Sequence, residues 1–424
     1  MKQGSGKIPL VLKLDESEIQ GPLRIRVRSF IETVRMQREK HEEAPVHALT
    51  DPYPVKYEKK DRKERIVLIP NTSHAFCRVM SAAMERQGLR AEPLPIGRDE
   101  AIRLGKKYVH NDICFPAQIV IGEALAALKS GKYDGKDVAI ATGKYIGDCR
   151  LTHYSALLRK ALDDAGFSDV PILTNDDADF HNLHPGFRLN LLSALRIAYA
   201  LPMIDILEEL LRKIRPYELT KGNADAAFEQ AMDAVIDGLS RHGVNGAKHG
   251  FEIIEARMSD VIQKSYFYRD MQVREYHLHK PLQEKLWYRM ADLFFDLAHD
   301  AADKIASAHP LYDRPAVRLP ELVKESDPII HHTFDAGEGV LIPGEILHHA
   351  AHGCRAFVIL QPFGCLPNHV VGRGISKRLK ELYPDIQILP LDYDPDVSFA
   401  NIENRLQMLI MNAREQEAEK DKTK

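Results

Sequence analysis

One stretch, from Ala356 to Gly374, constrains the fold of this chain most strongly. It begins with apolar, partly β-branched residues up to Leu360, a run of the length expected for a fully buried strand. A Gln-Pro-Phe-Gly break follows, then Cys365, and Pro367 stands where the first turn of a helix would accept it. The pattern predicts that Cys365 lies at the carboxyl end of a strand beside a helix N-terminus, where ligands of open α/β sheets collect.

Two other cysteines stand in similar positions. Cys114-Phe-Pro precedes an amphipathic helical run, and Cys149 follows a strand-like run and a glycine turn before another helical run. Partial positive charge at a helix N-terminus favours an anionic thiolate. The order strand–Cys–x–Pro–helix, expected around both Cys114 and Cys365, indicates two related lobes that face one site.

The remaining pattern predicts an α/β protein. Strand and helix signals alternate from Arg65 onward, long helical patterns dominate the middle of the chain, and the alternation then resumes. The expected fold has two Rossmann-like or flavodoxin-like lobes with mostly parallel sheets and a helical insertion between them. The expected parts are an N-terminal extension and linker (1–64), a first α/β lobe (65–185), the helical insertion (186–335) and a second α/β lobe with a charged C-terminal tail (336–424).

Three finer expectations concern single elements. A strand is predicted over Gly339–Ile342, the tail after Glu415 is expected to fray, and the segment from Lys56 to Glu64 is expected to be a solvated part of the linker. Trp287 lies in an apolar helical stripe and is expected in the core.

Composition excludes several classes of protein. The 424 residues include 58 basic and 61 acidic side chains, a net charge of −3 that gives no electrostatic case for nucleic acid or an anionic membrane. The chain shows no signal peptide and no run of membrane-spanning length, so a cytoplasmic location is expected. Five scattered cysteines then favour buried thiols, metal ligands or redox chemistry over a disulfide framework.

The cysteine spacing alone leaves the kind of site open. It lacks the close pairs of zinc ribbons and ferredoxins. Cys77, inside a helical pattern, and Cys354, just before a strand, are expected to be buried core thiols. Cys114, Cys149 and Cys365 follow loops and could share an iron–sulfur cluster or a zinc ion, or be buried thiols as well.

Several motifs together carry a family resemblance. They are Asn111–Ala117, Gly147–Tyr154, Leu157–Gly166, Gln361–Gly372 and Leu391–Pro395. The chain resembles the 2-hydroxyacyl-CoA (2-hydroxyglutaryl-CoA) dehydratase D-component family, in the branch related to the C-terminal part of long CoA-substrate-specific activase proteins. The resemblance covers about Ile66–Asn175 and Gly337–Ile410.

The resemblance implies a site and a chemistry. Cys114, Cys149 and Cys365 would hold a 4Fe–4S cluster with one iron open, in an oxygen-sensitive lyase (hydro-lyase) or low-potential reductase subunit. Such enzymes take an electron from an ATP-dependent iron–sulfur activator and use ketyl-radical chemistry. This chain has no glycine-rich phosphate loop, so the activator would be a separate protein. A second dehydratase-like subunit or a homodimer, and a small-molecule or acyl-CoA substrate, are the other implied partners.

Polar residues near the cysteines supply further candidates. His153 and His369 each lie four residues after a cysteine, and each could be a general acid, a hydrogen-bond donor to a cluster sulfur, or a surface histidine. Arg150 and Arg373 could bind a carboxylate or CoA phosphate, or pair with aspartates such as Asp148. The tract His348-His349-x-x-His352 is interpreted as an exposed helix end.

Two rival functions remain. One is a double-cubane-type reductase that acts on a small molecule and needs no CoA. The other is a non-enzymatic scaffold or regulatory subunit, in which the cluster is absent or affects association only.

Overall fold

The computed structural model divides the chain into two units, Met1–Pro54 and Val55–Lys424. The first unit contains helix α2 (Gln20–Glu39), in which the Thr33 hydroxyl donates a hydrogen bond to the Ser29 carbonyl. The structure describes residues 20–39, 51–95, 97, 99–110, 113–143, 149–174, 183–188, 190–241, 257–308, 312, 317–393 and 399–422.

A four-stranded parallel sheet forms the first part of the larger unit. Its strands are β1 (Ile66–Ile69), β2 (Arg90–Pro93), β3 (Val138–Thr142) and β4 (Ile172–Thr174), in the order β2-β1-β3-β4. The chain adds β2 on one side of β1 and then crosses to the other side for β3 and β4, with every pair parallel. This order creates a switch point between β1 and β3, where crevices form at the carboxyl ends of strands.

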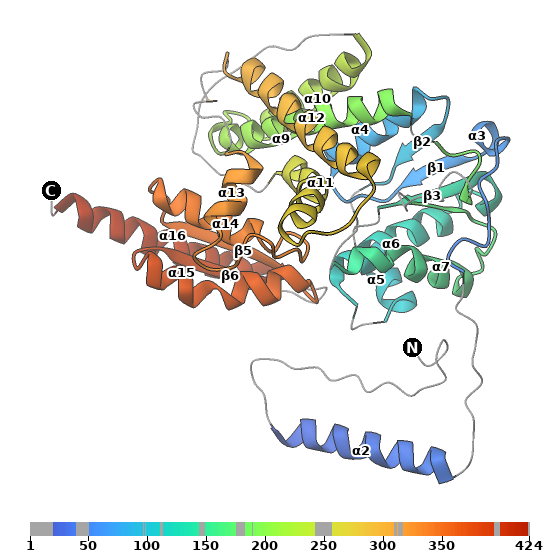
Figure 1. The fold of residues 1–424 in the computed structure, drawn as a ribbon, viewed down its shortest axis with the longest axis horizontal. Helices are drawn as coiled ribbons and strands as arrows, with labels where there is room; N and C mark the ends of the chain where they lie inside the picture. The colour runs from blue at the N-terminus through green and yellow to red at the C-terminus, as the bar shows by residue number, and fades with distance from the viewer. Residues whose placement is uncertain are drawn as a thin grey trace. The chain divides into compact units, whose positions relative to one another are not determined.

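Helices cover both faces of this sheet, as the βα alternation predicts. Figure 1 shows α4 on one side and α6 and α7 on the other. The helical elements are α3 (Asp61–Glu64), α4 (His74–Glu85), α5 (Asp99–Tyr108), α6 (Phe115–Lys129), η1 (Gly135–Asp137), η2 (Arg150–His153) and α7 (Tyr154–Asp164).

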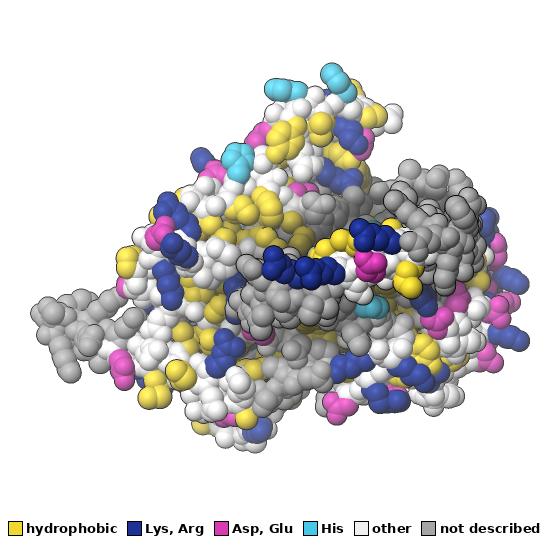
Figure 2. All heavy atoms as spheres, turned by 90° about the horizontal axis from the view of Figure 1, so that it is seen from below, with side chains coloured by type: hydrophobic (Ala, Val, Ile, Leu, Met, Phe, Trp, Pro, Cys, Tyr) yellow, Lys and Arg dark blue, Asp and Glu magenta, His cyan; other side chains and the backbone are white. Residues whose placement is uncertain are grey.

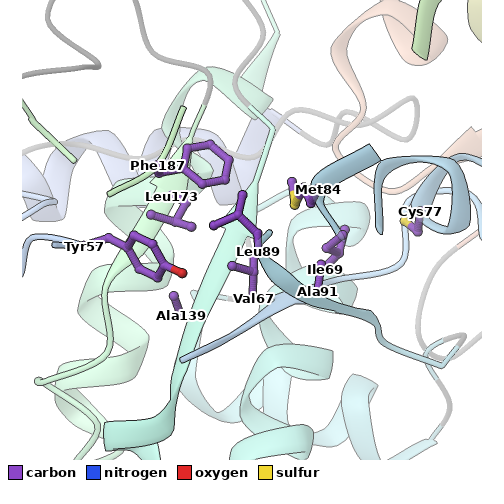
Figure 3. Packing of buried hydrophobic residues seen from close by; sticks show 10 residues of the cluster. All are labelled: Tyr57, Val67, Ile69, Cys77, Met84, Leu89, Ala91, Ala139, Leu173 and Phe187. Atoms are coloured by element: carbon purple, nitrogen blue, oxygen red, sulfur yellow. The ribbon is translucent and has the colours of Figure 1, made fainter. Parts of the chain in front are cut away.

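Alternate residues of the strands point into a core beneath α4. Val67 and Ile69 of β1 pack there with Cys77 and Met84 of α4, as Figure 3 shows. Tyr57 closes one end of this cluster and is fully buried. The expectation that residues 56–64 form a solvated linker is therefore wrong, because an apolar ring inside the charge run anchors the segment in the core.

The middle of the chain is helical, as expected. It contains α9 (Leu191–Ile214), η3 (Arg215–Tyr217), α10 (Asn223–Arg241), α11 (Met258–Glu275), α12 (Leu282–Ala306) and α13 (Leu319–Glu325). Helices α9, α10 and α12 share a buried cluster with α4, and α11 and α13 share another with the helix that follows. Trp287 is 51% exposed, so its expected place in the core is wrong.

A second, two-stranded parallel sheet lies near the C-terminus. Strands β5 (Ala356–Pro362) and β6 (Gln387–Tyr393) pair along their whole length. The associated helices are α14 (Leu341–Ala351), the π-helix η4 (Pro367–Arg373), α15 (Ser376–Leu382) and α16 (Phe399–Lys422). The α/β class with parallel strands and mostly helical content is thus confirmed.

Two local expectations fail in this part. The strand predicted over Gly339–Ile342 is instead the entry into α14, because Pro343 fits the first turn of a helix and cannot donate to a strand ladder. Helix α16 continues to Lys422, beyond Glu415, where fraying was expected.

The described surface agrees with the charge balance. No helix among the described residues is long and apolar enough to cross a membrane. On the face that Figure 2 shows, basic and acidic side chains are interspersed, as a net charge of −3 would suggest.

A buried carboxylate gives the fold a testable pH dependence. Glu123 of α6 is 4% exposed, accepts a hydrogen bond from the Asn71 amide at 2.6 Å, and burial raises its pKa to about 7. The folded state therefore binds a proton more tightly than the unfolded state, so stability is full below about pH 4.5 and falls as the pH rises to about 7. In Glu123→Gln, the decrease in the free energy of unfolding over this pH range should be smaller by about 2 kcal/mol.

Urea denaturation at pH 5 and pH 8 tests the expectation. Burial also raises the pKa of Asp260 to about 7. This carboxyl is present in both proteins, so its contribution cancels when the wild type and the variant are compared. An unchanged difference between the two pH values in Glu123→Gln would mean that Glu123 does not titrate in this range.

Candidate site of three cysteines

The three predicted cysteines come into one neighbourhood although they are distant in sequence. The Cys114 sulfur lies 3.2 Å from the hydroxyl oxygen of Tyr154. Burial, and then the proximity of Cys114, Cys149 and Cys365, raise the pKa of Tyr154. The Tyr154 hydroxyl therefore lies near all three thiols.

Cys114 begins helix α6. It is the N-cap residue, it is 4% exposed, and Pro116 stands in the first turn as expected. The Phe115 amide, which has no partner within the helix, donates to the Phe363 carbonyl at 2.8 Å. One expectation is wrong: helix α5, not a strand, is the element preceding Cys114, so the strand–Cys–x–Pro–helix order holds only for Cys365.

Cys365 follows strand β5 and precedes η4, as predicted. Gly364 has a φ of +69°, and a Cβ placed on it would lie 3.1 Å from the Cys114 Cα. Glycine therefore allows the Cys365 loop to lie against the backbone of Cys114. The Asn368 side-chain amide donates to the Cys365 sulfur at 3.1 Å.

Cys149 lies beyond the carboxyl end of β3, directly before η2. Burial raises the pKa of its thiol, and hydrogen bonds from the backbone amides of Leu151 and Arg150 oppose this rise. Backbone N–H groups directed at a sulfur stabilise its anionic form, as a metal-bound thiolate requires.

The Cys365 thiol and the Glu338 carboxylate lie close together here, and the Arg150 guanidinium lies near the same loop. Glu338 lies 3.8 Å from the Cys365 sulfur, and burial together with this carboxylate raises the pKa of Cys365 to about 11. The buried Lys264 ammonium is bonded to Asp335 at 2.6 Å, and the charge of Glu338 also acts on it. These thiols are therefore protonated at neutral pH, and a bound metal centre would lower their pKa values and favour the thiolate forms.

The spacing of the sulfur atoms distinguishes between metal centres. Among the described residues, the group whose ligand atoms all lie within 4.8 Å of one another is Asp327, His331 and His332, and it does not include the three cysteines. Thiolates on one zinc ion can lie at most about 4.6 Å apart, because each Zn–S bond is about 2.3 Å long. The three sulfurs therefore do not surround a single zinc ion in this arrangement.

The Lys264–Asp335 pair holds the segment that leads to Glu338, and it carries a prediction. The Lys264 side chain is fully buried, its ammonium lies 4.0 Å from the Tyr268 ring centre, and Asp335 is its charge partner. Asp335→Asn should lower the free energy of unfolding by about 2 kcal/mol, less than for a fully buried pair because Asp335 is 22% exposed.

Urea denaturation measures the effect. Lys264→Met combined with Asp335→Asn should recover part of the loss, because no buried charge is then left without its partner. A single variant as stable as the wild type would show that the pair does not stabilise this segment.

The two candidate histidines differ in their surroundings. His153 is exposed at the start of α7. His369 is half-buried on η4, its amide donates to the Cys365 carbonyl at 3.0 Å, and its Nε2 is buried without a partner in the described chain. The arrangement makes His369 the stronger candidate for a group that meets a ligand.

The other candidates have structural explanations. Arg373 pairs with Asp392 at 3.3 Å, and the Arg150 guanidinium lies beside Gly364. Asp148 lies outside the described residues. The tract His348, His349 and His352 lies at the end of α14, as expected, but His352 alone is exposed. His348 and His349 are half-buried and contact Glu325 and Glu345, so their expected exposure is wrong.

The two remaining cysteines lie outside this neighbourhood. Cys77 is fully buried in the core beneath α4, as expected. Cys354 is half-buried, and its thiol lies 3.6 Å from the Ala356 carbonyl, so the expected full burial is wrong.

Sequence reasoning missed three polar residues of the site. Tyr154 and Asn368 lie inside the motifs that carry the resemblance, and their nearness to the cysteines in sequence was the available signal. Glu338 escaped because the residues after it were assigned to a strand. Its two flanking glycines were the clue, since they indicate a close backbone approach.

Comparisons with protein-family models, with curated proteins and with solved structures find no match to this chain.

Proposed function

We propose that this chain is an iron–sulfur protein that binds one 4Fe–4S cluster through Cys114, Cys149 and Cys365. It would act as a subunit resembling the 2-hydroxyacyl-CoA dehydratases, in activator-dependent low-potential reductive or dehydration chemistry. The observation that carries the proposal is that the loops of Cys114 and Cys365 contact each other, while the Tyr154 hydroxyl interacts with all three thiols.

The fold supports the same proposal. We assign the four-stranded sheet with its helices to a first Rossmann-like or flavodoxin-like lobe, and β5 and β6 with theirs to a second. Cys149 and Cys365 follow strands β3 and β5 of different sheets, and Cys114 begins a helix that contacts the Cys365 loop. A site between the carboxyl ends of two parallel sheets is a usual place for a bound group in α/β proteins.

A bound cluster supplies a Lewis-acidic iron and an entry point for one electron. The chain's own residues hold and shield this group. The Tyr154 hydroxyl can donate a hydrogen bond to the Cys114 sulfur, and the Asn368 side-chain amide donates one to the Cys365 sulfur. Hydrogen bonds to ligand sulfurs disperse negative charge and raise the reduction potential. Burial of Cys114 and Tyr154 keeps water from this side of the site.

The proposal includes partners and a location. All five cysteines are free thiols, which suits the reducing cytoplasm. The electron would come from a separate ATP-dependent iron–sulfur activator, and a second dehydratase-like subunit or a second copy would complete the enzyme.

Anaerobic purification followed by iron, sulfide and zinc analysis tests the proposal. About four irons and four sulfides per chain, with an EPR signal after reduction by dithionite, are expected. A zinc-loaded or metal-free protein from cells able to build clusters would overturn it and leave the scaffold function.

A further inference from the structure

The outer face of helix α12 carries a continuous row of large apolar side chains, which we call the α12 stripe. Its members recur every three or four residues, and each is between 50% and 71% exposed: Leu282, Leu286, Met290, Leu293 and Leu297. Single exposed apolar residues are ordinary on a protein surface. A contiguous row of five on one helix face is typical of a surface that another protein covers.

The stripe is not the face by which α12 joins the fold. The opposite face, which includes Tyr288, Phe295 and Ala302, is buried. Among the described elements, α12 packs mainly on α9 and α11, beside which Figure 1 shows it. The core of the fold therefore does not use the stripe, and removal of the stripe from water requires a second surface.

The spacing of the four central residues is the same when it is read in either direction. Leu286, Met290, Leu293 and Leu297 are separated by four, three and four residues. Two copies of α12 can therefore lie antiparallel about a two-fold axis between Met290 and Leu293. Leu286 then faces Leu297 of the second copy, and Met290 faces Leu293, so every apolar layer meets an apolar layer.

The charges beside the stripe favour the same arrangement. Lys285 and Arg289 flank its N-terminal half, and Asp296 and Asp300 flank its C-terminal half on the same side. The side chains of Arg289 and Asp300 are exposed, although each forms an ion pair within its own chain. Antiparallel pairing brings the basic half to the acidic half of the second copy, whereas parallel pairing would bring like charges together.

We propose that the α12 stripe is the contact surface between two copies of this chain, paired antiparallel about a two-fold axis. The same contact would cover Trp287, which is exposed at the edge of the stripe. No residue of the stripe belongs to the site of the three cysteines, so the inference does not depend on the cluster. It names the surface by which a second copy joins this chain.

Sedimentation equilibrium of the full chain tests the inference. The wild type should be a dimer with twice the chain mass of 48.0 kDa. Met290→Glu places two carboxylates at the centre of the contact, and it should raise the dissociation constant by about a hundredfold or more. Met408→Glu on α16 is the matched control, because Met408 and Met290 are both 63% exposed, and it should leave the dimer unchanged.

Two results would overturn the inference. A monomeric wild type would mean that another occupant, such as α2 or a different protein, covers the stripe. Dissociation by Met408→Glu and not by Met290→Glu would place the contact on α16. Iron and sulfide analysis of the same samples keeps the proposed function separate, because loss of the dimer and loss of the cluster are then measured independently.

Cysteine cross-linking tests the antiparallel orientation and covers the case in which Met290→Glu folds poorly. A mixture of Leu286→Cys and Leu297→Cys should form a disulfide-linked dimer with a mild thiol oxidant. Either variant alone should form no more than the wild type, since like positions would lie about 16 Å apart along the helix axis, too far for a disulfide. Cross-links in each variant alone and none in the mixture would overturn the inference.

Discussion

Replacement of Cys114, Cys149 or Cys365 by alanine is expected to abolish the iron–sulfur cluster. Each variant should retain less than about a tenth of the wild-type iron and sulfide, because the two remaining thiolates cannot hold a centre that needs all three. The three thiols share one neighbourhood around Tyr154, so the three losses should be equal. Iron and sulfide analysis of anaerobically purified protein measures them.

The two cysteines outside the site provide the controls. Cys354→Ala changes a half-buried thiol that contacts the Ala356 carbonyl, and Cys77→Ala changes a core thiol. Both should keep the wild-type iron content, although Cys77→Ala should lose some stability. Loss of iron in only one or two of the three site variants would contradict a shared cluster.

Gly364→Ala should lower the free energy of unfolding by about 3 kcal/mol and reduce iron loading. Part of the cost is the left-handed backbone at a φ of +69°, which a Cβ strains. The rest comes from the Cβ itself, which would meet the Cys114 Cα at 3.1 Å and its nitrogen at 3.3 Å. These contacts would push the loops of Cys365 and Cys114 apart.

Gly88→Ala is the matched control for the strain. Gly88 has a φ of +75°, and a Cβ placed on it meets nothing within 4 Å. It should cost about 1 kcal/mol and leave iron loading unchanged. Urea denaturation and iron analysis separate the two effects. Equal costs and equal iron contents in the two variants would show that the contact at Cys114 is unimportant.

The helix N-termini behind the cysteines could be predicted from the sequence. Cys114 begins α6, Cys149 precedes η2, and Cys365 follows β5, because proline, glycine and apolar periodicity act locally. The parallel pairing of the strands also followed from their alternation with helices.

Contacts between distant segments could not be predicted in the same way. The sequence contains no local signal that the Phe115 amide would donate to the Phe363 carbonyl, or that Glu338 would reach Cys365. The prediction of a solvated linker at residues 56–64 was wrong for a related reason. Tyr57 is buried against residues of β3 and β4, which lie far along the chain. Tertiary burial decided these positions, and local propensity did not.

An iron anomalous difference map from anaerobically grown crystals of the wild type tests the central claim most directly. One strong peak in contact with the sulfurs of Cys114, Cys149 and Cys365 is expected. A peak elsewhere, such as at Asp327, His331 and His332, or iron-free density among the three cysteines would contradict it.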